Sequence, residues 1–285
     1  MAAPAWAGDC APPNDKPTPE IVRSVVIDRQ PLRVSIRPGP GPGLPLVLMN
    51  GIGSSLELLD PFVAAFDPAT TVIRFDVPGT GGSPPPAFPY SLASLARIVG
   101  KLLDELGHDR VDVLGISWGG ALAQQFAWQN PRRCHRLVLV ATCTGMPMVP
   151  PRLDVLARMM TPRRHRDPDY ANQIAGLLYG GVFRKEPDRA ATVLHADSRL
   201  GPRRGYLFQM MAVLGWSSLA WLPTIRQRTL VIAGRDDPII PAANGRLMVA
   251  CLPRATLHLH DDGHLALVTD ADRLAEVIRA FLAPL

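Results

Sequence analysis

Six short apolar runs between residues 44 and 260 constrain the fold of this chain more than any other feature. Each run ends in a turn-forming segment; in order they are LPLVLMN (44–50), TTVIRFD (70–76), VDVLGI (111–116), RLVLVA (136–141), TLVIAG (229–234) and ATLHLH (255–260). Uninterrupted apolar strands are typical of a parallel sheet that is covered on both faces. Helical patterns separate them, at about 56–65, 91–106, 118–129, 242–251 and 270–282. The alternation predicts an α/β fold with a doubly wound, mostly parallel sheet.

The alternation is interrupted once, between about residues 146 and 222, where several helical patterns follow one another without a strand. An insertion of this size predicts a helical cap, or lid, subdomain at 146–222. The remaining segments, 21–145 and 223–285, are then expected to form the α/β core. Two β-prone runs at 24–36 predict a hairpin ahead of the parallel strands. Residues 1–20 contain five prolines and no periodicity, so we expect a flexible leader.

Composition excludes several classes of protein. The chain has 285 residues, 47% of them hydrophobic and 19% charged, which is typical of a globular protein. Its four cysteines lie far apart without a CxxC motif, so we do not expect a disulfide framework or a metal site. We also expect no cofactor. No apolar run approaches the ~20 residues that a membrane-spanning helix needs, and the N-terminus lacks the basic start of a signal peptide. We therefore predict a cytoplasmic protein without a transmembrane segment. No nucleic-acid-binding motif is present.

A Gly-x-Ser-x-Gly motif at residues 115–119 points to a nucleophilic serine. It follows the apolar run 111–116 and opens the helical pattern 118–129. Small glycines permit the sharp turn that exposes a serine hydroxyl between a strand and a helix. The alternative is that Ser117 is an ordinary helix cap. We predict that Ser117 is the nucleophile of an acyl-transfer reaction.

A serine nucleophile needs a base, and the base needs a carboxylate to orient it. Asp236 and Asp237 follow the next-to-last strand, and His264 follows the last one, which places the three groups in the chain order Ser, Asp, His. The spacing Gly-x-x-Asp-x-x-x-Pro favours Asp237 as the acid, with Asp236 as second choice. His264 is predicted to be the base because it lies on a loop after Gly263, free to face the serine.

Two backbone N–H groups are expected to stabilise the oxyanion that develops during acyl transfer. One belongs to Trp118, the residue after the nucleophile, and the other to Ile52 in the loop Asn50-Gly51-Ile52-Gly53. We also predict that Asn50, Gly51 and Trp118 contact the substrate. A flexible glycine turn without this role is the alternative for the loop.

These motifs resemble the α/β-hydrolase superfamily over residues 45–285. A closer resemblance is carried by NGIGSSLELLDPF, FDVPGTGGS, GISWGGALAQQFA, LYGGVFRKEP, GWSSLAWL and DDGHLALVT. These segments look like the intracellular poly(3-hydroxyalkanoate) depolymerases of the medium-chain-length type, which act on storage granules. The resemblance implies an α/β-hydrolase fold with an inserted cap. It also implies that Ser117 attacks the polyester carbonyl, His264 transfers the proton and Asp237 stabilises the imidazolium, so that water then releases a 3-hydroxy acid.

The residues leave other functions open. A capped carboxylesterase, a lipase or a carbon–carbon bond hydrolase acting on a small molecule would need the same triad. A granule-associated protein with an inactive hydrolase fold is the alternative that is not an enzyme. The expected partner is a polyester storage granule or another hydrophobic acyl ester, and the oligomeric state stays open.

Charge and apolar side chains are both concentrated in the predicted cap. Residues 151–204 carry eleven Arg and Lys against six Asp and Glu, which accounts for the whole net charge of +5. Our hypothesis is that these positively charged side chains bind the anionic coat of a granule or the carboxylate products. The alternative is that they form an ordinary solvated surface. Large apolar residues of the cap either face the substrate or form the cap's own core: Met159, Met160, Tyr179, Phe183, Phe208, Met210, Met211, Trp216 and Trp221.

Overall fold

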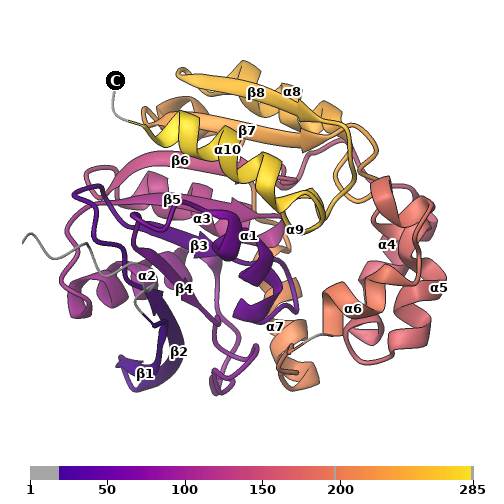
Figure 1. Ribbon diagram of the computed structural model, residues 1–285, viewed down its shortest axis with the longest axis horizontal. Helices are drawn as coiled ribbons and strands as arrows, with labels where there is room; N and C mark the ends of the chain where they lie inside the picture. The colour runs from indigo at the N-terminus through magenta and orange to yellow at the C-terminus, as the bar shows by residue number, and fades with distance from the viewer. Residues whose placement is uncertain (1–18, 196, 284–285) are drawn as a thin grey trace, which may run out of the picture.

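One mostly parallel sheet organises the molecule (Figure 1). The computed structural model describes residues 19–195 and 197–283, so most of the predicted leader, residues 1–18, lies outside the described part. Eight strands of the described part follow the order β1-β2-β4-β3-β5-β6-β7-β8. β2 pairs antiparallel with β1 and with β4, and all other neighbours are parallel. Their bounds are β1 Ile21–Ile27, β2 Gln30–Arg37, β3 Leu46–Met49, β4 Val72–Phe75, β5 Val111–Ile116, β6 Cys134–Val140, β7 Arg228–Gly234 and β8 Ala255–His260.

The predicted hairpin is formed by β1 and β2. Ile27 pairs with Gln30, so only Asp28 and Arg29 form the turn. Both turn residues have positive φ, 49° and 67°, which matches the twist that a two-residue hairpin turn requires. The hairpin extends the sheet beyond β4 at one edge.

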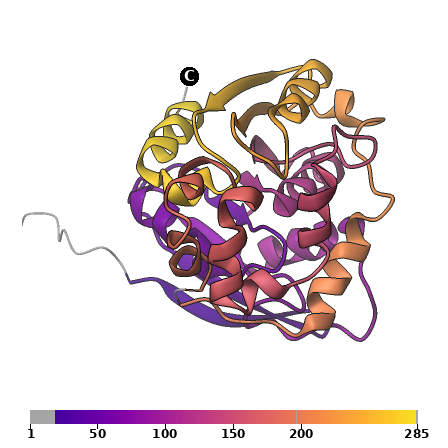
Figure 2. The same cartoon turned by 90° about the vertical axis from the view of Figure 1, so that its right-hand side faces the viewer.

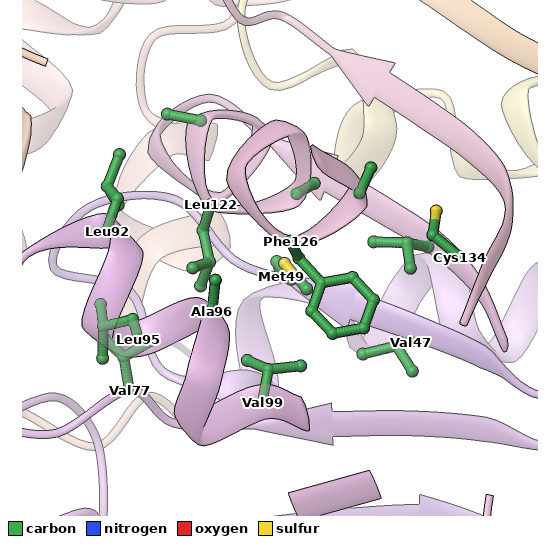
Figure 3. Packing of buried hydrophobic residues seen from close by; sticks show 14 of the residues in the cluster. Val47, Met49, Val77, Leu92, Leu95, Ala96, Val99, Leu122, Phe126 and Cys134 are labelled. Atoms are coloured by element: carbon green, nitrogen blue, oxygen red, sulfur yellow. The ribbon is translucent and has the colours of Figure 1, made fainter. Parts of the chain in front are cut away.

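Helices cover both faces of the sheet (Figure 1). One face carries α1 (Asp60–Ala65), α9 (Ala266–Thr269) and α10 (Ala271–Leu282), and the other carries α2 (Leu92–Glu105), α3 (Trp118–Gln129) and α8 (Ala242–Cys251). Leu122 and Phe126 of α3 pack over Val47 and Met49 of β3 in the second of these layers (Figure 3). Both faces of the central strands are therefore buried, as their uninterrupted apolar sequences predict.

Between β6 and β7, the described chain contains helices and loops and no strand, apart from one isolated bridge, Gly145 to Ser217. The helices are α4 (Leu153–Met159), α5 (Pro168–Leu178), α6 (Arg189–His195) and α7 (Arg203–Val213); short 3-10 turns lie between α4 and α5 (Arg163–His165), between α5 and α6 (Gly181–Arg184) and after α7 (Leu222–Thr224). α4, α5 and α6 gather beside the sheet at the right of Figure 1, and Figure 2 looks onto them from that side. We call this segment, residues 146–222, the cap.

The predicted fold class, a mostly parallel α/β sheet with helices on both faces, is confirmed. β3 and β4 are shorter than the apolar runs that predicted them, because they pair over only three or four residues, whereas the other four parallel strands match their runs to within two residues at either end. The helical pattern at 56–65 resolves into a 3-10 turn, Leu56–Leu59, followed by α1, and α9 was not anticipated. No helix among the described residues has the length and apolar character needed to cross a membrane.

Candidate active site

Ser117 occupies a sharp turn between β5 and α3. Its φ and ψ are 54° and −120°, a backbone conformation that costs energy in any residue with a side chain. Two glycines make the turn possible: a Cβ on Gly115 would lie 2.3 Å from the Gly119 carbonyl oxygen, and one on Gly119 would lie 2.1 Å from that of Met49. The Gly-x-Ser-x-Gly spacing therefore reflects close packing of strand, turn and helix around Ser117.

The structure brings Ser117, His264 and Asp237 together. The distance from Ser117 Oγ to His264 Nε2 is 2.9 Å, and His264 Nδ1 lies 2.8 Å from Asp237 Oδ2. The three residues follow β5, β8 and β7, and parallel strands place their carboxyl ends at one edge of the sheet. A carboxylate can only accept, so Nδ1 donates to Asp237 and Nε2 is left to accept the serine hydroxyl proton.

The two adjacent aspartates have different partners. Asp237 Oδ1 accepts from the backbone N–H groups of Ile239 and Ile240, both at 2.9 Å, which orients Oδ2 toward the histidine. Asp236 instead accepts from the Arg184 guanidinium and, at 2.7 Å, from the Gly181 N–H. The hydrogen bond and charge of Arg184 hold the pKa of Asp236 below its usual value. Asp237, and not Asp236, is thus the carboxylate next to His264.

The loop expected to form the oxyanion hole lies against Ser117. Gly51 and Ile52 line the same cavity as Ser117, and within the described residues no acceptor bonds the Ile52 N–H. Trp118 opens α3, so its N–H has no intrahelical partner. The Asn50 side chain turns inward: Oδ1 accepts from the Gly51 N–H and Nδ2 donates to the Ser55 carbonyl. Asn50 therefore shapes the loop and is not among the cavity-lining residues.

Gln209 of α7 joins the two segments that carry these N–H groups, a role that no sequence motif indicates. Its side-chain oxygen accepts from the Gly53 N–H at 2.8 Å, and its backbone carbonyl accepts from the Trp118 indole N–H, also at 2.8 Å. The side chain is buried. The indole of Trp118 is thereby directed into the cap interface, away from the cavity lining.

A small cavity opens beside Ser117 and His264. Much of its wall is apolar, formed by Leu58, Ile116, Met159, Leu194, Ile239 and Leu265. Of the large cap residues considered from the sequence, Met159 and Tyr179 reach this cavity, whereas Phe183 is buried in the cap and Met160 and Met211 are exposed. Trp216 and Trp221 pack against the core. Its apolar lining is suited to contact with an aliphatic group next to the serine.

The cap is fastened to the loops that carry Asp237 and His264. The Tyr179 carbonyl accepts from the His264 N–H at 2.8 Å. Gly180 and Gly181 follow with φ of 64° and 54°, and a Cβ on Gly180 would lie 1.9 Å from the Asp236 carbonyl oxygen. Asp262 Oδ1 accepts from the Val182 N–H at 2.8 Å. The Tyr-Gly-Gly turn of the cap thus packs directly on the acid and histidine loops.

Asp76, in the segment FDVPGTGGS that follows β4, has a structural role. It accepts from the N–H groups of Leu56 and Gly82, both at 2.8 Å, and pairs with Arg33. Burial raises the pKa of its carboxyl group. It is not among the residues lining the cavity beside Ser117.

Comparison with known proteins identifies related chains. A family model described as alpha/beta hydrolase fold matches residues 45–271. A poly(3-hydroxyalkanoate) depolymerase of Ectopseudomonas oleovorans is 49% identical over 267 residues, covering 93% of this chain and 94% of the relative. The 2-hydroxy-6-oxononadienedioate/2-hydroxy-6-oxononatrienedioate hydrolase of Cupriavidus pinatubonensis is 30% identical, covering 86% and 84% of the two chains. The crystal structure of a hydrolase from Pseudomonas aeruginosa PA01 superimposes with a TM-score of 0.75 at 28% identity, over 92% of this chain and 98% of that one.

Proposed function

This chain belongs to the α/β-hydrolase family, and on that premise we propose that it is a serine hydrolase of medium-chain-length poly(3-hydroxyalkanoate). It cleaves ester bonds of the polyester and releases 3-hydroxyalkanoic acids. The observation that carries the proposal is the hydrogen-bonded chain from Ser117 through His264 to Asp237 beside a largely apolar cavity. The 49% identity to a poly(3-hydroxyalkanoate) depolymerase extends over 93% of the chain, so it includes the cap.

In the proposed mechanism, His264 Nε2 takes the proton of Ser117 as Oγ attacks the ester carbonyl. The N–H groups of Ile52 and Trp118 stabilise the negative oxygen of the tetrahedral intermediate. The intermediate collapses when His264 returns the proton to the departing alkoxide, which leaves an acyl group on Ser117. Water, activated by the same histidine, then releases the acid. Asp237 stabilises the imidazolium in both halves, and Gly51 contacts the bound acyl group.

We place this reaction in the cytoplasm at the surface of polyester storage granules, because the polymer is a solid phase that the enzyme has to meet at its boundary. The cavity beside Ser117 holds no more than a short part of such a chain. One or a few monomer units at a time therefore enter from the granule. The apolar wall formed by residues such as Leu58, Met159 and Leu194 supports an aliphatic side chain in that position.

Native granules and a soluble ester, p-nitrophenyl octanoate, separate the candidate functions. Wild-type protein and a control variant, Ser24→Ala, which changes an exposed serine of β1, are expected to hydrolyse both substrates. Ser117→Ala should lose at least about 10³-fold in kcat on each, because no other group can form the acyl-enzyme.

Three other results would contradict the proposal. Wild-type turnover of the soluble ester alone would favour a capped esterase acting on small molecules. Granule hydrolysis by Ser117→Ala would exclude Ser117 as the nucleophile. Granule binding without hydrolysis, together with no labelling by a fluorophosphonate, would indicate an inactive hydrolase fold.

A further inference from the structure

A buried guanidinium without a counter-ion lies in the wall of the active-site cavity. Arg164, in the 3-10 turn between α4 and α5, is 3% exposed and lines the cavity together with Ser117 and His264. Its Nη1 donates to the Tyr206 hydroxyl at 3.1 Å and to the Thr161 carbonyl at 3.3 Å, and its Nε has no partner. Among the described residues, no carboxylate lies within 4 Å of this guanidinium.

Two further polar groups of the same cavity are also unpartnered. The Nε2 atom of His165 and the hydroxyl of Tyr179 are buried without a hydrogen bond, and both side chains line the cavity. Burial, and next the charge of Arg164, lowers the pKa of His165 well below its usual value, so the ring is neutral. Burial raises the pKa of Tyr179 to about 12, so its hydroxyl keeps its proton and can donate.

Such an arrangement is costly unless a ligand completes it. An arginine is always charged, and a buried charge without a partner is strongly unfavourable. Buried polar atoms without partners also cost free energy, which a bound ligand recovers. A carboxylate supplies what the guanidinium and the Tyr179 hydroxyl lack, because its two oxygens accept hydrogen bonds and its charge pairs with the guanidinium.

We propose that Arg164 and Tyr179 form a carboxylate subsite, and that the enzyme acts at the carboxylate-bearing end of the polyester. The inference rests on the proposed function and specifies which ester of the chain is cleaved. The terminal unit of a poly(3-hydroxyalkanoate) has a free carboxylate and is joined to the chain through its 3-hydroxyl oxygen. It is therefore the alcohol part of the last ester bond, and its carboxylate lies only three carbons from the ester oxygen.

The chemical step follows from this placement. Ser117 Oγ bonds to the carbonyl carbon of the penultimate unit, and the bond from that carbon to the 3-oxygen of the terminal unit breaks. His264 transfers the serine proton to this oxygen, so that a 3-hydroxy acid leaves with its carboxylate on Arg164. Water then cleaves the acyl-enzyme and returns a chain that is one unit shorter and ends in a new carboxylate. Monomers are released successively from that end.

A pair of dimeric substrates tests the subsite: 3-hydroxyoctanoyl-3-hydroxyoctanoate as the free acid and as its methyl ester. They share the scissile ester and differ only in the terminal charge. The wild-type enzyme is expected to cleave the internal ester of the acid with a kcat/KM about 10- to 100-fold higher, as charge-assisted hydrogen bonds imply. Arg164→Met should bring this ratio close to one, because the acid then loses its charge-assisted hydrogen bonds and the methyl ester never had them.

Arg163→Met is the matched control, because Arg163 is the exposed neighbour that pairs with Asp167. It should keep the wild-type ratio. If Arg164→Met does not fold, Tyr179→Phe provides a second test, since it removes only the unpartnered hydroxyl and should lower the ratio several-fold. Free 3-hydroxyoctanoate should likewise inhibit wild-type turnover of p-nitrophenyl octanoate more strongly than its methyl ester does.

Equal wild-type kcat/KM for acid and methyl ester, or an Arg164→Met variant that lowers both equally, would overturn the subsite and leave the proposed function standing. Failure of the wild-type enzyme to cleave either dimer or the granules, despite turnover of p-nitrophenyl octanoate, would overturn the proposed function itself. The two failures are therefore distinguishable in one set of assays.

Discussion

Neighbouring residues with identical side chains have separate tasks in the candidate site. Asp236 and Asp237 differ by one position, but the turn after β7 directs the first to Arg184 of the cap and the second to His264. Asp237 is buried, whereas the Arg184–Asp236 pair is half exposed. We propose that Asp237 orients the base and that Asp236 fastens the cap.

Replacement of each aspartate by asparagine should separate these tasks. Asp237→Asn is expected to lower kcat by about 10³- to 10⁴-fold, because an amide no longer holds the histidine in the required tautomer. Asp236→Asn should leave kcat within a few-fold of wild type and lower stability by at most about 1 kcal/mol, as for an exposed ion pair. Steady-state kinetics and urea unfolding of both variants measure this. The opposite order of activities would make Asp236 the catalytic acid.

Gln209 is expected to be a positioning residue for the oxyanion hole. Gln209→Met keeps the size of the side chain but removes the oxygen that accepts from Gly53. We expect kcat to fall about 10- to 100-fold with little change in KM, because misplaced oxyanion donors weaken only the transition state. Gln209→Glu, which retains an acceptor oxygen, should recover part of the loss. A Gln209→Met enzyme with wild-type kcat would show that the bond to Gly53 has no influence on the reaction.

At the scale of elements, the cap and the catalytic loops form one packed unit. Three backbone contacts, to Asp236, Asp262 and His264, connect the Tyr-Gly-Gly turn after α5 with the loops that follow β7 and β8. Positive φ at Gly180 and Gly181 directs the chain into this contact. The cap therefore acts on the geometry of the triad as well as covering it.

Gly180→Ala should disrupt this contact. Its Cβ would meet the Asp236 carbonyl oxygen, and alanine would in addition be forced into a left-handed conformation, which costs about 1–2 kcal/mol. We expect Gly180→Ala to lose more than about 1–2 kcal/mol of unfolding free energy, because the clash adds to the conformational cost. We also expect kcat to fall, because the clash displaces the loop that carries Asp237. Gly107→Ala is the control: φ is 75°, but the Cβ meets open space, so only the conformational cost applies. Equal losses of stability in urea unfolding would contradict the packing argument.

The difference between strand ends and cap elements explains which site residues could be predicted from the sequence. Ser117, Asp237 and His264 each follow an apolar strand, and strand order brings such positions to one edge, so local motifs were sufficient. Arg164 and Gln209 lie in short cap elements whose inward face depends on how the cap packs on the core. Nothing in RRHR or FQMMA marks one arginine or one glutamine as buried. Cap residues were consequently predicted as a charged and apolar group, without individual roles.

At the scale of the whole molecule, the positive charge of the cap is partly compensated. Arg184 pairs with Asp236 and Arg199 lies near Glu57, both in the core, while Arg163 pairs with Asp167 within the cap. Arg164 is inside the cavity and cannot meet a granule. Other cap cations, among them Lys185 and Arg203, have no carboxylate partner among the described residues, and Arg164 differs from them in being buried, which favours carboxylate binding as its role.

Buried His165 should make stability depend on pH. Its pKa is lowered in the folded state, by burial first and then by Arg164 and His195. Below about pH 6.5 the unfolded chain takes up a proton that the folded protein does not, so stability falls with acidification. From pH 7.5 to 5.5, His165→Gln should therefore lose about 1 kcal/mol less unfolding free energy than wild type. Urea unfolding at both pH values measures this; identical losses would mean that His165 takes up its proton in the folded state.

The central claim is that Ser117 carries the acyl group of a medium-chain polyester during turnover. Rapid acid quenching of the enzyme with the 3-hydroxyoctanoate dimer, followed by mass spectrometry of the peptides, tests it directly. We predict a 3-hydroxyoctanoyl group on the peptide containing Ser117 in wild-type enzyme and none in Ser117→Ala. The same group on another residue, or product release with no acylated peptide at any quench time, would contradict the account.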